Sequence, residues 1–459
     1  MHQIETSFCP QGDPGMLAAR NSVEAPHELL LTRLVQARAR TDELFALIKP
    51  ESIYERPIPE RHRMIFYLGH LEAFDCNLLR ERLLPINSFN QHLDRLFAFG
   101  IDPVGGGLPT DGPSDWPAVE EVKEYVAQIR AAIDEGLERH LKAGIKTRAE
   151  FSPDILLNVA IEHRLMHAET FTYMLHQLGL EHKFRKPTKA QQGIEPPEAR
   201  MIEIPDGVAT LGLSKSEGAF GWDNEFVSHT EAVSAFAIDK YKVTCRQYLG
   251  FVEAGGYEDP ALWADADWEW IERNGIRHPI FWKKHKDHWH YRTMFDEVPL
   301  PLEWPVYVSQ AEASAYARWA GKSLPTEAQW HRAAYADPSR SERNYPWGSE
   351  PADARFGNFD FHSWDPTPVS VFPQGESALG VADMLGNGWE WTETVFAPFE
   401  GFEPFPFYRG YSADFFDGKH FVIKGGSART AACMLRRSFR NWFQPHYQYV
   451  YAGFRCVSN

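Results

Sequence analysis

Two histidines lie four positions apart in the stretch AIEHRLMHAETFTYML, residues 160–175, which is rich in helix-forming residues. On a helix, residues i and i+4 lie on the same face, so His163 and His167 can hold one metal ion together. A third histidine, His70, lies in the segment YLGHLEAF, which has the apolar pattern of a bundle-core helix. A buried neutral histidine needs a partner for each ring nitrogen, and bundles build metal sites from facing helices. The three histidines therefore indicate a metal centre.

The ligands alone leave the identity of the metal open. Three imidazoles without a carboxylate suit zinc, and with open coordination positions they also suit Fe(II) that reacts with O₂. Glu169 follows His167 by two residues, which is about 200° around a helix, so we expect it to face away from the metal in a supporting or structural role. We expect His176 to be a solvated or capping histidine. The alternative for the pair at 163 and 167 is ordinary packing or a solvated helix face.

The elements around these histidines predict an N-terminal helical bundle over residues 26–182. Four long segments carry apolar residues at helical spacing; they are 26–48, 63–84, 116–141 and the segment that contains 160–175. A Gly- and Pro-rich loop, residues 98–117, joins the second segment to the third, and loops of this length are usually functional or mobile. The polar residues 1–25 are expected to form a flexible arm.

A second domain is predicted from residue 201 to residue 459, after a linker at 183–200 that is rich in proline and charge. Short strand-like runs at 201–213, 233–244 and 421–428 alternate with loops rich in Gly, Pro and Trp, and we expect two short helices among them. The chain is therefore expected to be an α+β protein of two domains, which its length of 459 residues allows.

Composition narrows the classes of partner. The net charge of −16 argues against nucleic acid or an anionic membrane surface as partner. No apolar run approaches the length of a membrane span, and the first residues lack the pattern of a signal peptide. The 5 cysteines are widely spaced without a CxxC pair, which is typical of a reducing compartment. We expect a cytoplasmic enzyme with small-molecule substrates.

The second half of the chain carries five segments that resemble the formylglycine-generating-enzyme-like (sulfatase-modifying-factor) domain, a variant of the C-type-lectin fold. In order they are KSLPTEAQWHRAA (322–334), YPWG (345–348), VADMLGNGWEWT (381–392), IKGGSA (423–428) and AGFRC (452–456). The first half resembles a DinB-like four-helix bundle. This pair of domains resembles the ergothioneine-type sulfoxide synthases, which are non-heme iron enzymes that use O₂ to join a sulfur donor to C2 of the imidazole of hercynine. The site pattern is similar to that of a sister group, the selenoneine synthases, which join a selenosugar to the same carbon.

The resemblance implies that His70, His163 and His167 bind Fe(II). The segment PFYRGYS, residues 406–412, matches a family segment with two tyrosines at the mouth of the iron site. It implies that Tyr408 donates a proton or hydrogen atom during the reaction and that Tyr411 lies beside it. A phenol close to the metal is chemically suited to that role.

The segment FRNW, residues 439–442, matches the family segment that lines the hercynine pocket. It implies that Asn441 and Trp442 face the trimethylammonium and carboxylate groups, and an aromatic face attracts quaternary ammonium. Met166 occupies a position where many relatives carry a glutamine that contacts the imidazole substrate, which leaves open what holds the ring. The alternative for Tyr408, Tyr411 and Trp442 is packing in an aromatic-rich domain.

Two departures from the family pattern concern the sulfur or selenium donor. Relatives that use γ-glutamylcysteine carry an arginine-rich loop after the second bundle helix, whereas the loop 100–117 contains no Arg or Lys. Phe443 replaces the aspartate that meets the ammonium of the donor. These changes favour a neutral seleno- or thiosugar, with its hydroxyls bound by backbone and by Asp102, Thr110, Asp111 and Asp115. The alternative is that other arginines reach the site, such as Arg80, Arg82 or Arg95.

Three other functions compete with this one. A copper-dependent formylglycine-generating oxidase needs two cysteine ligands, but the matching segment CMLRRS pairs Cys433 with Ser438. A lectin-like binding module would not need the three bundle histidines, and loss of iron binding with the fold retained would support it. A DinB-like thiol transferase would use zinc, and metal analysis with aerobic and anaerobic assays separates it from an O₂-dependent enzyme.

Overall fold

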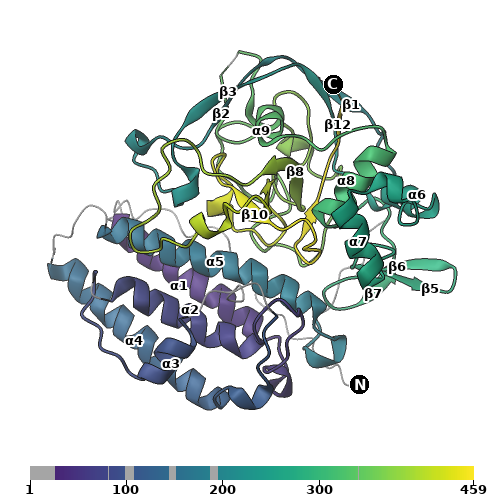
Figure 1. Ribbon diagram of the computed structural model, residues 1–459. Coiled ribbons are helices and arrows are strands. Elements are labelled where there is room, and N and C mark those ends of the chain that lie inside the picture. The colour runs from purple at the N-terminus through teal and green to yellow at the C-terminus, as the bar shows by residue number, and fades with distance from the viewer. Residues whose placement is uncertain are drawn as a thin grey trace, which may run out of the picture.

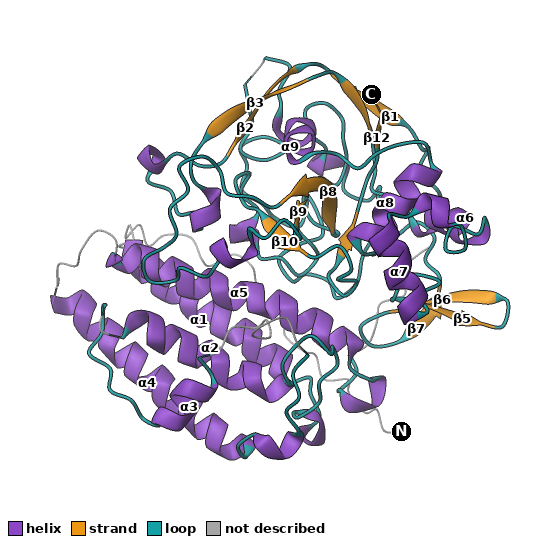
Figure 2. Cartoon of the chain, viewed as in Figure 1, coloured by secondary structure: helices purple, strands orange, loops and turns teal. Residues whose placement is uncertain are grey.

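The computed structural model describes residues 26–80, 82–98, 108–143, 151–186, 195–339 and 341–458. The predicted arm, the centre of the predicted linker and Asp102 lie outside these residues. A bundle of long helices forms one side of the molecule, and a domain of short strands, short helices and long loops forms the other (Figures 1 and 2). None of the described helices combines the length and apolar character that a membrane crossing requires.

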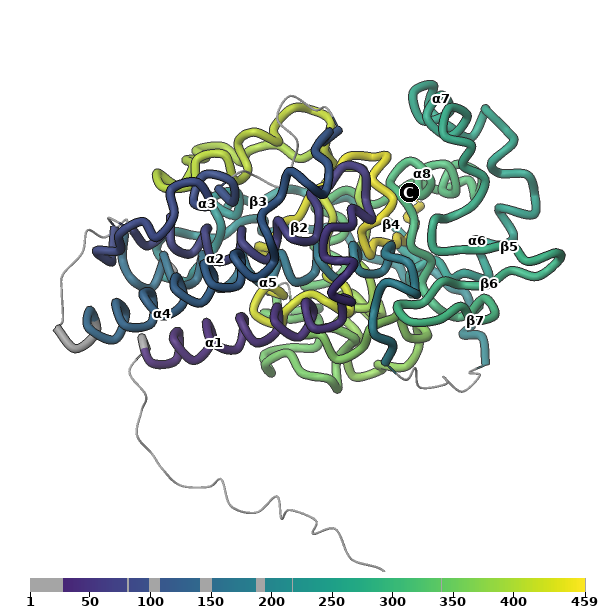
Figure 3. Tube along the Cα trace, turned by 90° about the horizontal axis from the view of Figure 1, so that it is seen from below, coloured from purple at the N-terminus to yellow at the C-terminus, as the bar shows by residue number. Residues whose placement is uncertain are grey.

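The helices of the bundle correspond to the four predicted segments, with one short helix added. They are α1 (Pro26–Phe45), α2 (Met64–Leu79), α3 (Gln91–Leu96), α4 (Val119–Ala143) and α5 (Pro153–Gln177). The long helices run side by side (Figures 1 and 3), and α5 packs against α1 and α2 while α2 also packs against α4. Almost every residue of α2 is buried, so neighbouring elements cover that helix on most of its faces rather than along one stripe.

The helix α5, which carries two of the candidate ligands, has clear local start and stop signals. The side chain of Ser152 accepts a hydrogen bond from the backbone N–H of Ile155, and Pro153 occupies the first turn, where its missing N–H costs nothing. The helix ends at Gln177, shortly before Gly179. Within it, most residues from position 156 onward are buried, because the bundle covers one side and the second domain covers the other.

The second domain is built from small sheets rather than one large sheet. The central sheet has the order β10-β9-β8-β11 and consists of β8 (Trp389–Val395), β9 (Phe421–Lys424), β10 (Asn441–Phe443) and β11 (Ala452–Gly453). Around it lie the sheet β1-β4-β12, the hairpin β2-β3 and the sheet β5-β6-β7. Their strands are β1 (Met201–Ile204), β2 (Gly207–Leu211), β3 (His229–Val233), β4 (Phe236–Asp239), β5 (Trp282–His285), β6 (His288–Arg292), β7 (Glu297–Pro299) and β12 (Val457–Ser458).

The prediction of two short helices in this domain was wrong, because its described part contains four. They are α6 (Cys245–Glu253), α7 (Asp265–Asn274), α8 (Gln310–Trp319) and α9 (Glu327–Tyr335). Each is only 9 or 10 residues long, which is too short for a clear hydrophobic period. Three of them begin with a capping box, and this local signal marks their starts.

The two domains meet along one side of α5 (Figure 1). Glu162, Glu169 and His176 are spaced seven residues apart, so they form one stripe on the helix, and all three are buried. We call these three residues the interface stripe. Each hydrogen-bonds to the second domain: Glu162 pairs with Arg436, Glu169 accepts from Trp389, and His176 contacts other partners there.

The prediction for His176 as a solvated or capping residue was wrong. Its Nδ1 lies 2.9 Å from the hydroxyl of Tyr451 and its Nε2 lies 2.6 Å from the carbonyl oxygen of Arg292. Burial holds the pKa of His176 well below its ordinary value, so the ring is neutral. His176 therefore fastens the end of α5 to the second domain. Its partners are brought to it by tertiary packing, so the local sequence does not distinguish it from a surface histidine.

Candidate active site

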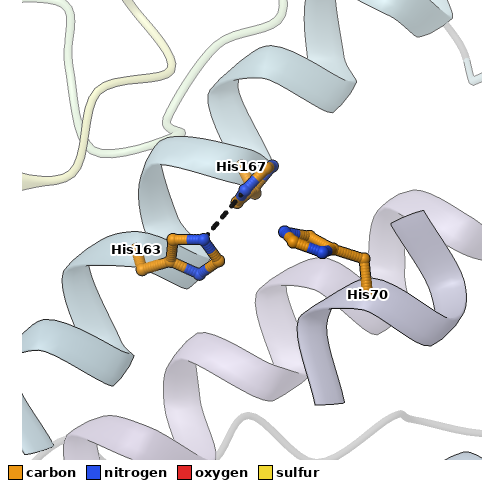
Figure 4. Close-up of side chains that lie close together, drawn as sticks. All are labelled: His70, His163 and His167. Atoms are coloured by element: carbon orange, nitrogen blue, oxygen red, sulfur yellow. Dashed lines mark hydrogen bonds between the residues drawn. The ribbon is translucent and has the colours of Figure 1, made fainter. Parts of the chain in front are cut away.

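The three predicted metal ligands converge in the bundle core. His163 and His167 on α5 and His70 on α2 are all buried and face one another (Figure 4). One potential ligand atom from each residue lies within 4.8 Å of the others. The Nε2 atoms of His163 and His167 are 3.1 Å apart. Two helices thus bring three imidazoles to one point, and within the described residues this is the one histidine, cysteine or carboxylate group with such spacing.

The hydrogen bond of His70 sets its tautomer. Its Nδ1 lies 2.8 Å from the carbonyl oxygen of Phe97, and a carbonyl can only accept. In the neutral ring Nδ1 therefore carries the proton and Nε2 presents its lone pair. This is the arrangement in which a backbone carbonyl orients a metal-binding histidine.

The electrostatics of the cluster keep the rings in the form that binds metal. Burial lowers the pKa of His70 to about 4. Burial, followed by the charges of neighbouring groups, holds the pKa of His163 and of His167 well below the ordinary value. Metal ions bind the neutral imidazole, so no proton has to be displaced near pH 7.

A metal ion fits this cluster on chemical grounds. When the facing Nε2 atoms of His163 and His167 both present lone pairs they repel, and a cation between them satisfies both. His70 adds the third lone pair from the opposite helix. Glu169 instead directs its carboxylate to the second domain, where it accepts from Trp389 Nε1 at 2.8 Å, Ser427 Oγ at 2.5 Å and Thr430 Oγ1 at 2.8 Å. Three neutral nitrogen ligands suit Fe(II) or Zn(II).

The cluster opens on a cavity of about 850 Å³ between the two domains. Nine of the residues that the sequence pointed to line this cavity; they are His70, His163, Met166, His167, Tyr408, Tyr411, Asn441, Trp442 and Phe443. They come from α2, α5, the loop before β9 and the strand β10. The cavity is large enough for two small substrates beside a metal ion.

The two tyrosines lie on the side of the cavity formed by the second domain. The ring of Tyr408 is 6.3 Å from that of His163 and 5.3 Å from that of Phe74, measured between centroids. Phe74 in turn stacks on His163 at 3.4 Å. The ring of Tyr411 stacks on that of Trp222 at 4.0 Å, and its hydroxyl donates to the sulfur of Met166 at 3.5 Å.

The strand β10 presents the pocket residues in sequence. Asn441, Trp442 and Phe443 pair with Ile423, Val422 and Phe421 of β9, which fixes their register. The indole of Trp442 stacks on Phe396 at 4.1 Å, with Tyr411 and Phe415 at its edges. The ring of Phe443 stacks on that of Tyr447 at 5.2 Å. This end of the cavity therefore offers flat aromatic surfaces.

The sequence reasoning missed a buried arginine in the cavity. Arg61, just before α2, is 5% exposed; its Nε donates to the Tyr447 hydroxyl at 2.9 Å and its Nη2 to the Tyr173 hydroxyl at 3.3 Å. Its sequence context, IPERHRM, gives no signal of a site, because the two tyrosines come from distant segments. The inference that charged partners for a zwitterionic donor are absent was therefore incomplete.

The predicted sugar-binding loop is partly occupied by its own contacts. The carboxylate of Asp111 pairs with Arg56 and with Arg63, and Asp115 accepts from the backbone N–H of Gly112 at 2.7 Å. Of the described loop residues from 108 to 117, Leu108 is the one that lines the cavity. The structure thus does not bring Thr110, Asp111 or Asp115 to the cavity. Nor do the three alternative arginines line it: Arg80 pairs with Asp94, while Arg82 and Arg95 bond to nearby backbone carbonyls.

The copper alternative finds no support in the local chemistry. Burial raises the pKa of the Cys433 thiol to about 11, which disfavours the thiolate that Cu(I) needs. The hydroxyl of Ser438, at the position of the second ligand, donates to Glu225 at 2.6 Å. Ser438 therefore belongs to a structural hydrogen bond.

Comparison with known proteins assigns both domains to known families. Residues 33–171 match the profile described as DinB superfamily, and residues 184–459 match that described as Sulfatase-modifying factor enzyme 1-like domain. The second match alone spans more than half of the 459 residues. The fold class predicted from the sequence, a DinB-like bundle followed by a domain of the sulfatase-modifying-factor type, is confirmed.

Relatives of which the match covers most of both chains define the family. The hercynine oxygenase of Mycolicibacterium smegmatis is 33% identical over 94% of this chain and 98% of that protein. The chain belongs to the hercynine oxygenase family. The hercynine oxygenase of Mycobacterium tuberculosis is 38% identical over 54% of this chain and 58% of that protein. Ergothioneine biosynthesis protein 1 of Neurospora crassa is 30% identical over 90% of this chain, and the match covers 55% of that protein.

Proposed function

We propose that the protein is an O₂-dependent non-heme iron enzyme that joins sulfur or selenium to C2 of the imidazole ring of hercynine. The observation that carries this proposal is the meeting, on one cavity, of three neutral imidazoles with the tyrosines and the Asn-Trp pair. Two relatives are named hercynine oxygenase, which supports hercynine as the substrate. His70, His163 and His167 would hold Fe(II), whose chemistry at such a site is the activation of O₂.

The reaction that we propose balances with one O₂. The C2–H bond of hercynine and the S–H or Se–H bond of the donor break, and a C2–S or C2–Se bond forms. One oxygen atom ends on the chalcogen and the other leaves as water, so O₂ accepts four electrons and the two substrates supply them. The protein has to hold both substrates side by side, because this proximity replaces a three-body encounter in solution.

Tyr408 is the proposed proton or hydrogen-atom donor. Its ring lies 6.3 Å from that of His163 and borders the cavity, whereas the ring of Tyr411 stacks on that of Trp222. Burial raises the pKa of Tyr411 well above its ordinary value, so the hydroxyl of Tyr411 stays protonated and acts as a donor to Met166. The Tyr411 hydroxyl thereby holds the side chain of Met166 in place, and Met166 has no amide group with which to contact the substrate ring.

For the donor we propose a neutral seleno- or thiosugar. The support is the apolar surface of Phe443 against Tyr447, which offers an ammonium group no carboxylate. An unpartnered buried charge costs several kcal/mol. A specific observation favours a second candidate, γ-glutamylcysteine: Arg61 supplies a positive charge in the cavity, and a relative is named for ergothioneine biosynthesis.

A parallel donor assay tests the proposal. The iron-loaded protein is given hercynine and O₂ with thioglucose, selenoglucose, cysteine or γ-glutamylcysteine, and products are measured by mass spectrometry. Product from hercynine with any donor supports the reaction class, and a higher kcat/KM for the sugars supports the neutral donor. Faster turnover of γ-glutamylcysteine would refute the neutral donor, and no product with any donor would refute the reaction class.

A further inference from the structure

We infer that Trp222 and Asp223 form a platform that positions the loop carrying both tyrosines, and that Trp222 is thereby a positioning residue for the reaction. The inference deepens the proposed function and rests on it, because it concerns how the proposed donor Tyr408 is held. We call residues 405–412 the tyrosine loop. The platform lies outside the five segments by which the chain resembles its family, at the start of a short 3₁₀ helix (Asp223–Glu225).

The indole of Trp222 contacts two elements at once. Its ring stacks on that of Tyr411, with the centroids 4.0 Å apart and the planes at 24°. Its Nε1 donates to the carboxylate of Glu162 at 2.9 Å, and Glu162 lies on α5 directly before His163. Trp222 is fully buried, and a buried indole N–H needs an acceptor. This one side chain therefore ties the tyrosine loop to the helix that carries two of the proposed metal ligands.

Asp223 provides a second tie to the same loop. The hydroxyl of Ser412 donates to the carboxylate of Asp223, and both residues are buried. Two consecutive loop residues thus contact two consecutive platform residues. Within the loop, the backbone N–H of Tyr411 donates to the carbonyl oxygen of Tyr408 at 3.2 Å, and the ring of Tyr408 lies 6.5 Å from that of Trp222. A shift of Tyr411 on the platform would therefore also move Tyr408.

The platform is itself fixed by a buried ion-pair network. Glu225 accepts from the backbone N–H of Trp222 at 2.8 Å and pairs with Arg436. Arg436 also pairs with Glu162 at 2.7 Å. Glu162 keeps this arginine as partner when the indole N–H is removed. Replacing Trp222 therefore removes one tie of the loop without leaving a buried charge unpaired.

The platform acts behind the cavity rather than in it. The residues that line the described part of the cavity include Tyr408 and Tyr411 but not Trp222 or Asp223. A change in the platform should therefore alter how the tyrosines are placed and leave substrate binding intact. Misplacing a reacting group by about 1 Å can cost up to about 10²-fold in rate. When the donor is misplaced, we expect O₂ to be consumed in oxidising the thiol alone, without formation of the C2–S bond.

The test uses one variant for each tie and a matched control. Trp222→Phe keeps an aromatic ring and loses the N–H, and Ser412→Ala removes the hydroxyl that Asp223 accepts from. The control is Trp263→Phe, which removes a buried indole N–H that donates to the carbonyl oxygen of Gly256 at 2.9 Å, away from the residues that line the described part of the cavity. The iron-loaded proteins are assayed with hercynine and either thioglucose or γ-glutamylcysteine. The measurements are iron content, kcat, KM for hercynine, and product formed per O₂ consumed.

We expect Trp222→Phe to lower kcat roughly 10-fold and to lower the product formed per O₂ consumed. Ser412→Ala should act in the same direction with a smaller effect. Iron content and KM for hercynine should match those of Trp263→Phe in both variants. The product formed per O₂ does not depend on the fraction of protein that is folded, so a merely structural role would leave this ratio unchanged.

An unchanged ratio in Trp222→Phe would overturn the role of Trp222, whether turnover stays the same or falls together with iron content. An unchanged ratio in Ser412→Ala would remove Asp223 from the platform. If Trp222→Phe fails to fold, the ratio in Ser412→Ala decides whether the platform positions the loop. Wild-type protein that forms no product from hercynine with either donor would refute the proposed function itself, which is a different outcome from a changed ratio.

Discussion

Replacing Glu169 tests how the second domain is fastened to the helix that carries two metal ligands. In Glu169→Ala three donors of the second domain lose their shared acceptor. The indole N–H of Trp389 can only donate, and Trp389 is 2% exposed. Leaving this N–H without an acceptor therefore costs about 1–3 kcal/mol of stability. The hydroxyls of Ser427 and Thr430 can rotate and also contact each other at 3.5 Å, so we expect each to cost at most about 1 kcal/mol.

The lost hydrogen bonds of Glu169→Ala should together destabilise the fold by about 2–4 kcal/mol. Part of this loss is offset, because the variant no longer buries a carboxyl group. The same cost of burial raises the pKa of Glu169. Glu169→Gln keeps an acceptor for Trp389 and should lose about 1 kcal/mol. The measurement is urea unfolding followed by tryptophan fluorescence, with Glu181→Ala as control because that side chain is 74% exposed. If Glu169→Ala unfolds within about 0.5 kcal/mol of the control, the carboxylate does not fasten the two domains.

Three further predictions concern the metal, the proton donor and pH. His70→Ala should abolish stoichiometric Fe(II) binding, measured by metal analysis, while full occupancy would remove His70 from the ligand set. Tyr408→Phe should retain iron and hercynine but lose roughly 10²–10⁴ in the rate of bond formation; an unchanged rate would make Tyr411 the next candidate. The pKa of His176 in the folded protein lies below its ordinary value of 6.5. As pH falls below 6.5, the unfolded chain therefore takes up a proton at this residue before the folded protein does. Stability is then lost by at most about 1.4 kcal/mol per pH unit. In urea titrations of the metal-free protein, the stability difference between wild type and His176→Asn should be constant above pH 6.5 and shrink below it; a constant difference to pH 5 would contradict this.

The metal cluster was predictable from the sequence because two of its members are local. The i, i+4 spacing of His163 and His167 specifies a shared helix face without any tertiary information. His70 required only the assumption that the two apolar helices face each other. That the three residues bind iron stays a prediction, since ligand type alone does not distinguish iron from zinc.

The five family segments were recognisable for a different reason: they hold the fold together. Glu390 in the third segment accepts hydrogen bonds from Arg455 in the last segment at 2.6 Å and from Trp330 in the first at 3.0 Å, and it pairs with Lys242 at 3.0 Å. Charges that are fully buried have to be paired, so these residue types are constrained together. The segments therefore predict the domain, whereas the site residues lie mostly between them.

Arg61 could not be predicted because its environment is assembled from three distant parts of the chain. Its partners Tyr173 and Tyr447 lie 112 and 386 residues away in sequence. No local period or motif records such a contact, and a lone arginine before a helix is ordinarily solvated. The same limit explains the error for His176, whose partner Tyr451 is 275 residues away.

The helix α5 links the metal cluster to the cavity through its geometry. The interface stripe and the histidine pair lie on different sides of one helix, and Met166 and Tyr173 lie between them and line the cavity. A rotation of α5 that moved the histidines would also break the contacts of Glu162 with Arg436 and of Glu169 with Trp389. Since those contacts are buried, such a rotation is costly. The second domain therefore does more than supply the tyrosines and the strand β10: by clamping one side of α5, it keeps the ligands on the other side pointed at the cavity where the substrates must bind.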